Sequence, residues 1–387
     1  METPIYLDHA TTTQPSDFLI QQMQPFFKRH WHCVTAPYLK GKEPFATINQ
    51  KVRKIKAGLG ATKQDTLVLT SCGAEAISQI YHAFAIDEVT ETGKNHFVTT
   101  PLEDASFFMG INRFEPLSIQ KKAAPLNDYG VLTPENLESV LSPRTSLVSL
   151  SWASGLTGII HPIAELAELC KDKGVAFHVD VSDVLGKLYF RFEDLPIDYL
   201  TFDGDRFHAP KGTGGLLIRH PHKLTALIPD GMQQQGQRGG TFNLPGLVGL
   251  GVAFEELEEH FSHLCMETAR LRNQFEESIA HAVPEVSLLF RETERLPNVS
   301  VIAFPGVSSE LLAFHLAQQD IYASFGGGRH QKLDALLQAA GVHPDLAKCA
   351  LSFSLGRTTT QEEVQKAVGI ISDAAAKCRT FSAKVDA

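Results

Sequence analysis

Acidic side chains follow three short apolar runs of the sequence. The runs occupy residues 96–99, 175–180 and 198–202, and the acidic residues at or just after their ends are Glu103, Asp180, Asp183, Asp203 and Asp205. If these runs are strands of a parallel sheet, their carboxyl ends meet at one edge, where ligands of such sheets bind. With His178 and His208 nearby, the set offers carboxylate and imidazole groups that suit a divalent cation.

An arginine in the same stretch supports a second interpretation. Arg206 directly follows Asp205, and a buried guanidinium group can pair with several carboxylates at once. In this interpretation the acidic set is a cleft that is cross-linked internally by Arg206 and also by Arg329, with water in the remaining space. We favour the second interpretation and predict no metal ion.

The elements that must position these side chains are short and alternate along the chain. The pattern predicts strands at residues 66–70, 96–99, 145–150, 175–180, 198–202 and 215–218, with helices at 74–85 and from Pro162 to 173. Alternation of strands and helices indicates an α/β fold with a mostly parallel sheet and helices on both faces. Gly174 is expected to end the second of these helices.

The pattern changes after about residue 250. A helix is predicted over residues 252–282, followed by a strand at 299–302, a helix at 309–318 and a glycine-rich loop at 326–328. A last helix begins near Thr360, where the segment Thr360 to Glu363 resembles a capping box. We interpret this part as a smaller α+β domain.

Composition limits the classes of protein to consider. The chain has 387 residues, a formal net charge of -9 and 43% apolar residues, which is typical of a globular protein with two or three structural units, or one large domain and a smaller partner. The acidic balance argues against a nucleic-acid or membrane partner. Six cysteines without a CxxC pair, no secretory signal and no long apolar segment predict a cytoplasmic protein.

Six segments of the chain match a known pattern in their order and spacing. They are YLDHATTT at residues 6–13, TSCGAE at 70–75, FHVD at 177–180, FDGDRFHAPKG at 202–212, RGGT at 238–241 and FSLGR at 353–357. Together they resemble the NifS/IscS cysteine desulfurases of the class V aminotransferase group. The resemblance implies the fold type I of pyridoxal-phosphate (PLP) transferases. It also implies a seven-stranded sheet in a large domain (16–255), a small domain formed by both termini (1–15 and 256–387), and a homodimer with sites at the subunit interface.

The resemblance also implies roles for several residues. In this family a lysine forms a Schiff base with PLP, and a cysteine on a mobile loop becomes a persulfide. Asp180 matches the aspartate that pairs with the pyridinium nitrogen, and Arg357 matches the arginine that binds the substrate carboxylate. Thr241 matches a threonine that reaches the phosphate from the neighbouring subunit.

The remaining positions depart from the family pattern. Arg206 stands at the Schiff-base lysine, Glu103 at the stacking histidine, and the persulfide cysteine falls at about Arg329. Arginine stays protonated and cannot supply the neutral amine that an imine needs. The other replaced positions of the PLP pocket are Ala74, Asp203 and Asp205 at the phosphate, Asp183 at the ring-oxygen glutamine and Gly155 at an asparagine.

These departures predict a non-catalytic homologue of the desulfurases, without catalytic residues and without PLP. It would act through binding or dimerisation, as a homodimer, with a true cysteine desulfurase or an iron-sulfur scaffold protein as further candidate partners. The alternative is an active PLP-dependent transferase or lyase, of the desulfurase or class V aminotransferase type. Such an enzyme would hold PLP noncovalently or through a substitute lysine such as Lys211.

Overall fold

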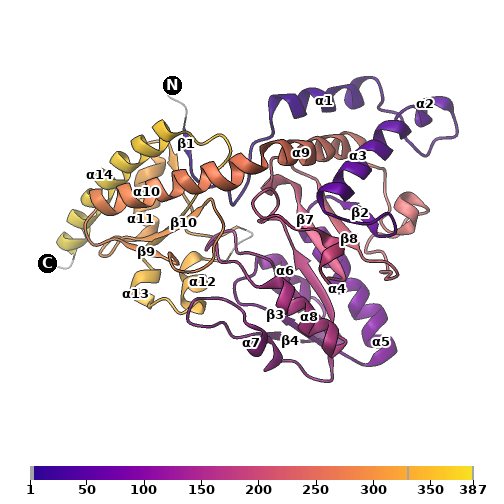
Figure 1. Cartoon of the computed structure of the whole chain (residues 1–387), viewed down its shortest axis with the longest axis horizontal. Coiled ribbons are helices and arrows are strands. Elements are labelled where there is room, and N and C mark those ends of the chain that lie inside the picture. Colours follow the sequence, from indigo (N-terminus) through magenta and orange to yellow (C-terminus); the bar gives the residue numbers. More distant parts are fainter. Residues whose placement is uncertain (1–3, 329–330, 386–387) are drawn as a thin grey trace.

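A seven-stranded sheet forms the centre of the larger part of the chain (Figure 1). The computed structural model describes residues 4–328 and 331–385. In spatial order the strands are β2 (Thr66–Thr70), β8 (Gly214–Ile218), β7 (Tyr199–Asp203), β6 (Ala176–Asp180), β5 (Thr145–Ser151), β3 (His96–Thr99) and β4 (Gln120–Ala123). Strands β4, β3, β5, β6 and β7 run parallel, and β8 is antiparallel to β7 and β2. The predicted mostly parallel sheet is therefore confirmed.

Helices cover both faces of this sheet because neighbouring strand residues point to opposite sides. Phe97, Leu147 and Leu216 pack with α4 (Gly73–Ala83) and α6 (Ala105–Asn112). Their neighbours along the strands pack in a separate core with helices of the other face, namely α3 (Phe45–Gly58), α8 (Ile163–Lys173) and α9 (Leu244–Ser262). The remaining helices of this part are α1 (Asp17–Lys28), α2 (Leu39–Lys42), α5 (Val89–Thr92) and α7 (Pro134–Glu138).

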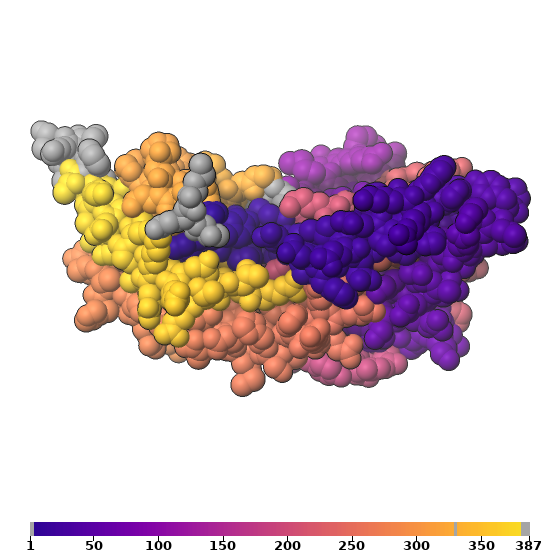
Figure 2. Space-filling model, turned by 90° about the horizontal axis from the view of Figure 1, so that it is seen from above, coloured from indigo at the N-terminus to yellow at the C-terminus, as the bar shows by residue number. Residues whose placement is uncertain are grey.

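A third core joins the two ends of the chain, since Ile5 and Leu7 pack in it with residues of the last helix. The antiparallel strands β9 (Ser287–Leu289), β10 (Val299–Ala303) and β12 (Ala350–Ser354) lie with helices α10 (Thr268–Ala282), α11 (Ser309–Ala317), α12 (Leu333–Ala339), α13 (Pro344–Ala347) and α14 (Gln361–Val385). Strand β1 (Ile5–Tyr6) pairs in parallel with β11 (Ile321–Tyr322). In Figure 2 the N-terminal residues run from beside α14 to the opposite end of the molecule. The domain boundaries near residues 15 and 255 stay a prediction.

Some helix bounds differ from the prediction. The long helix begins at Leu244 rather than at 252, with the Asn243 side chain accepting a hydrogen bond from the Gly246 N–H at 3.0 Å, and a π-helical turn (His263–Glu267) separates α9 from α10. Helix α4 ends at Ala83 and continues as a π-helical turn (Phe84–Glu88).

The predicted helix ends are confirmed at two places. Gly174 follows α8 with a φ of 61°. At the start of α14 the Thr360 N–H donates to Glu363 Oε2 at 2.7 Å, and the Glu363 N–H donates to Thr360 Oγ1 at 3.1 Å, which is a capping box. None of the described helices has the length and apolar character needed to cross a bilayer.

Candidate active site

The predicted site residues meet at the carboxyl ends of the parallel strands. Asp180 is the last residue of β6, Asp203 is the last residue of β7, and Glu103 follows β3. The N-terminal segment reaches the same place, because the Thr13 N–H and hydroxyl both donate to the carbonyl of Asp205 at 2.8 Å. One end of the large sheet and the N-terminal segment thus form a single site.

Arg206 is the centre of this site. It lies on a short helical turn (Gly204–Arg206) after β7 and is 2% exposed. Its Nη1 lies 3.1 Å from Asp183 Oδ1 and also donates to the carbonyl of Ala10, and its Nη2 lies 2.9 Å from Asp104 Oδ2. The predicted cross-linking of the acidic cleft by Arg206 is confirmed for Asp183, whereas Asp104 is a partner that the sequence did not predict.

The charge of Arg206 is fixed by these neighbours. Burial by itself lowers the pKa of a guanidinium group. The carboxylates near Arg206 have the opposite effect and raise the pKa of Arg206 above its usual value, with the largest contributions from Asp183 and then Asp104. The side chain is therefore a cation at neutral pH.

The Glu103 side chain is buried and is bonded to groups other than Arg206. Its Oε1 accepts a hydrogen bond from the Thr100 hydroxyl at 2.6 Å, and its Oε2 accepts one from the Ser151 N–H at 2.9 Å. Burial, together with the nearby charge of Asp104, raises the pKa of Glu103 to about 8. At neutral pH this group is mainly an uncharged acid held between two strands.

Asp180 ends a chain of buried hydrogen bonds. Its Oδ2 accepts from the Thr201 hydroxyl at 2.6 Å, and Thr201 in turn lies 2.9 Å from His178 Nε2. His178 Nδ1 lies 2.7 Å from the Ser149 hydroxyl, which lies 2.8 Å from the Tyr81 hydroxyl. Because an ionised carboxylate only accepts, every donor in this chain points toward Asp180, and His178 is neutral with its proton on Nε2.

The environment of Asp180 and His178 agrees with this assignment. Burial lowers the pKa of His178 to about 3, which keeps the imidazole uncharged. Burial raises the pKa of Asp180 to about 6, while hydrogen bonds from Thr201 and from the Ser182 N–H act in the opposite direction. Close to neutral pH Asp180 can therefore take up a proton, or it can accept a hydrogen bond from a positively charged donor.

Asp183 and Gly155 are packed against each other. A Cβ atom on Gly155 would lie 2.6 Å from Asp183 Oδ2, closer than any ordinary contact. The side chain that turns toward Arg206 therefore occupies the volume that a larger residue at position 155 would use.

Of the three residues predicted at the phosphate position, Asp203 and Ala74 lie at the start of α4. Asp203 packs on Gly73, the first residue of that helix, since a Cβ on Gly73 would lie 3.1 Å from Asp203 Cβ and 3.5 Å from its Oδ2. Ala74 is exposed on the first turn of α4. Asp205 turns toward the N-terminal segment, where its Oδ2 accepts from the Thr12 hydroxyl at 3.3 Å.

Arg357 pairs with a carboxylate of the chain itself. Its Nη1 lies 2.9 Å from Glu256 Oε2, a close ion pair whose geometry is not that of a hydrogen bond, and both side chains are nearly buried. Glu256 Oε1 also accepts a hydrogen bond from the Ser16 hydroxyl. Sequence reasoning missed Glu256, which lies on α9 far from any recognised segment.

The other predicted positions lie at the margin. Thr241 is exposed on the loop before α9, and its neighbour Arg238 forms an ion pair with Glu75 at 2.8 Å. Lys211 is exposed on the turn before β8. Arg329 lies outside the described residues, so its predicted pairing and its place on the mobile loop stay predictions.

Lys187 is a site residue that the sequence did not reveal. It lines a cavity of about 20 Å³ together with Arg206, His9 and Asn298, which is space for roughly one water molecule. Its Nζ donates to the carbonyl of Asp183 at 3.0 Å, and burial lowers the pKa of Lys187. The sequence signal that could have revealed Lys187 is its position, since Gly186 and Lys187 follow Asp183 closely.

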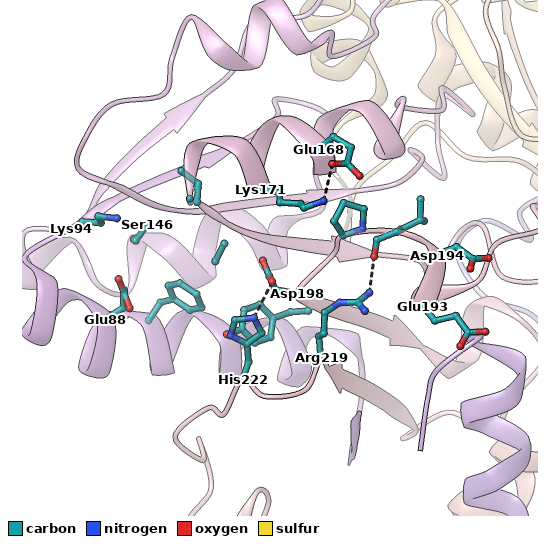
Figure 3. Close-up of a pocket in the computed structure, with 17 residues that line it drawn as sticks. Glu88, Lys94, Ser146, Glu168, Lys171, Glu193, Asp194, Asp198, Arg219 and His222 are labelled. Carbon is teal, nitrogen blue, oxygen red and sulfur yellow. Dashed lines mark hydrogen bonds and ion pairs between the residues drawn. The ribbon is translucent and has the colours of Figure 1, made fainter. Parts of the chain in front are cut away.

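A larger cavity lies at the other end of the strands, opposite the candidate site (Figure 3). It has a volume of about 730 Å³ and is lined by the amino ends of β6 and β7, with His222 lying 3.0 Å from Asp198 and Glu168 pairing with Lys171. None of the predicted site residues lines this cavity. Among the described residues no three His, Cys, Asp or Glu side chains gather in a way that could hold a metal ion.

Comparison with known proteins identifies the family. The model of the family described as aminotransferase class-V matches residues 5–367. A cysteine desulfurase of Bradyrhizobium diazoefficiens is 31% identical, with 98% of this chain and 96% of that protein covered, and the cysteine desulfurase IscS of Clostridium botulinum is 28% identical, with 96% and 94% covered. A solved structure named NifS-like protein matches with a TM-score of 0.90 and 28% identity, covering 97% of this chain and 100% of that one.

The chain therefore belongs to the aminotransferase class-V family, as a NifS/IscS-like member with the PLP-transferase fold type I. The predicted family and fold are confirmed.

Proposed function

We propose that the chain is a non-catalytic member of the cysteine desulfurase family, which acts through binding and dimerisation. The observation that supports this most directly is the environment of Arg206. A permanently charged guanidinium group, buried and paired with Asp183 and Asp104, stands at the position of the family's Schiff-base lysine. The amine that would anchor PLP is replaced by a structural cation.

The residues present do not fit a PLP molecule held in the manner of the family. Asp203 brings a carboxylate to the start of α4, where the resemblance puts the phosphate, and like charges at such short range repel by several kcal/mol. Asp183, at the position that should contact the ring oxygen, is committed to Arg206. We therefore assign no chemical step to PLP in this protein.

Dimerisation is the part of the function that a surface feature supports. Large apolar side chains are exposed on α1, on α2, on the loop between them and on the loop before α9, and we call this set the N-terminal apolar surface: Phe18, Phe27, Trp31, Leu39 and Met232, with 56%, 60%, 66%, 81% and 83% of their area exposed. Large exposed apolar surfaces mark sites of association. We propose a second copy of the chain as the first occupant, and a true cysteine desulfurase or an iron-sulfur scaffold protein as further partners, in the cytoplasm.

One observation favours the alternative of an active PLP enzyme. Lys187 lies beside Arg206 and Asp183, and its burial lowers the pKa of its amine, which favours the neutral form that an imine requires. In such an enzyme Lys187, rather than the exposed Lys211, would be the substitute lysine.

Release of alanine from cysteine in the presence of PLP, and of sulfide when a thiol reductant such as dithiothreitol is added, tests the proposed function. The Bradyrhizobium diazoefficiens relative, assayed at equal concentration, is the positive control. We expect no product above a protein-free blank. Turnover approaching that of the relative would overturn the proposal.

A further inference from the structure

The carboxylate of Asp203 lies at the start of α4, so that a side chain of the protein itself supplies an anion at this helix end. The first N–H groups of a helix have no partner within the helix, and they carry partial positive charge. Cys72, the residue that caps α4, contributes no side-chain hydrogen bond to them. An anion supplied from elsewhere is therefore favourable at this helix end.

The position of Asp203 is fixed by its strand. Its N–H donates to the Ser182 hydroxyl at 2.8 Å, and it pairs in register with Gly214 of β8. Gly214 presses on the helix start, because a Cβ there would lie 2.5 Å from the carbonyl carbon of Cys72. The ends of β7 and β8 thus hold the Asp203 side chain against Gly73 without room for a larger anion between them.

Two other carboxylates follow the same pattern. Asp183 pairs with Arg206 and packs on Gly155, and Glu256 pairs with Arg357. Each of the three carboxylates occupies a place where the resemblance puts an anionic or acidic group of the cofactor or of the substrate.

We infer that the Asp203 carboxylate takes the place of a phosphate group at the start of α4, so that the pocket excludes phosphorylated ligands by internal occupancy as well as by the loss of the lysine. This inference rests on the proposed function, since it explains how the site is filled in a protein that does not use PLP. It assigns to Asp203 the role of blocking phosphate at the start of α4. This role does not depend on which residue stands at position 206.

Inorganic phosphate is the probe for this inference. Thermal unfolding of the full-length chain is measured in phosphate and in chloride at equal ionic strength. The proteins compared are the wild type, Asp203→Ser and a control variant, Glu168→Gln. The control removes one negative charge beside the distant cavity of Figure 3. We expect no phosphate-specific shift for the wild type or the control. For Asp203→Ser we expect a rise in Tm with phosphate, corresponding to binding tightened at least about tenfold.

Circular dichroism establishes that each variant is folded, and Asp203→Asn replaces the serine variant if that one is not. Phosphate-specific stabilisation of the wild type equal to that of Asp203→Ser would overturn the inference, and so would the lack of any gain in the folded variant. Failure of the proposed function has a different signature, which is product formation from cysteine by the unmodified chain.

Discussion

The carboxylate of Asp183 fills the space that a side chain at position 155 would need. A Cβ atom on Gly155 would lie 2.6 Å from Asp183 Oδ2 and 2.8 Å from Oδ1, while Oδ1 lies 3.1 Å from Arg206 Nη1. Residues 155, 183 and 206, where the resemblance implies departures from the family pattern, are therefore parts of one packed arrangement. A reversal at one of them would disturb the other two.

Gly155→Ala is expected to destabilise the chain because the added methyl group meets the Asp183 carboxylate. We expect a loss of about 1–3 kcal/mol in the free energy of unfolding, as for other overpacked sites. In an Asp183→Ala background the same substitution should cost less, with a coupling energy of at least about 0.5 kcal/mol in a double-mutant cycle measured by urea unfolding. Gly369→Ala, in open space on α14, is the control and should be neutral or stabilising. Equal costs in both backgrounds would contradict the packing described here.

Arg206→Met should be strongly destabilising because it removes the Arg206 cation from its ion pairs with Asp183 and Asp104. Breaking a buried ion pair from one side costs about 3–5 kcal/mol, and denaturant unfolding measures this directly. The triple variant Arg206→Met/Asp183→Asn/Asp104→Asn should recover part of the loss.

The control for this prediction is Arg191→Met, since Arg191 is exposed and pairs with Glu193 at the surface. Exposed pairs contribute about 0–1 kcal/mol, so this variant should be almost as stable as the wild type. Similar losses for Arg191→Met and Arg206→Met would mean that the Arg206 cluster is not a structural element.

Glu103 makes stability depend on pH in a defined direction. Its pKa is raised from 4.5 to about 8 in the folded protein, so the folded state keeps a proton that the unfolded state releases. The free energy of unfolding therefore falls as the pH rises from 4.5 to about 8, by up to about 1.4 kcal/mol per pH unit from this group. Glu103→Gln should remove this dependence, because a glutamine resembles the uncharged acid.

Urea unfolding of the wild type and of Glu103→Gln at several pH values checks this sign. The difference in stability between the two proteins should shift in favour of the variant as the pH rises. Glu168→Gln changes an exposed side chain, so the free energy of unfolding of this variant should change with pH in the same way as that of the wild type. A constant difference between wild type and Glu103→Gln at all pH values would contradict the burial argument.

Sedimentation velocity should find a homodimer that depends on the N-terminal apolar surface. Leu39→Glu and Trp31→Glu place charges on this surface and should weaken association by at least about tenfold, since a charge buried in an apolar contact is costly. Met109→Glu changes an equally exposed apolar residue on α6 and is the control. A monomeric wild type, or a dimer that all three substitutions leave intact, would contradict the proposed dimer surface.

The strands of the large sheet could be predicted because burial on both faces leaves apolar runs without interruption. Strand β3 begins and ends where the sequence predicts, at His96–Thr99, and β5 begins where it predicts, at Thr145. Strand β4, with the sequence QKKA, was missed because its side chains are mainly polar and mostly exposed. Hydrophobic patterns do not reveal a strand that is defined mainly by its backbone pairing.

The start of α9 was missed for a different physical reason. Gly246, Gly249 and Gly251 lower the intrinsic helix propensity of its first turns. Packing compensates, since a Cβ on Gly249 would meet Pro210 at 2.4 Å and one on Gly251 would meet Lys51 at 2.6 Å. The glycines are present because the helix lies close against its neighbours, which a single sequence does not disclose.

The site itself was predicted in its composition and in one of its pairings. The cross-link between Arg206 and Asp183 followed from their positions after adjacent strands, as did the meeting of Asp180 and Asp203 at one edge. Asp104 and Glu256 were missed because ion pairs depend on side-chain direction and on contacts between distant elements. Local sequence contains no information on either.

The absorption spectrum of the protein after incubation with excess PLP and desalting tests the central claim most directly. Borohydride reduction and peptide mapping follow, to locate any lysine adduct. A protein in which Arg206 replaces the anchoring amine should retain no chromophore and yield no PLP-modified lysine. A stoichiometric adduct on Lys187, Lys211 or any other single lysine would contradict the account and identify the anchor of an active PLP enzyme.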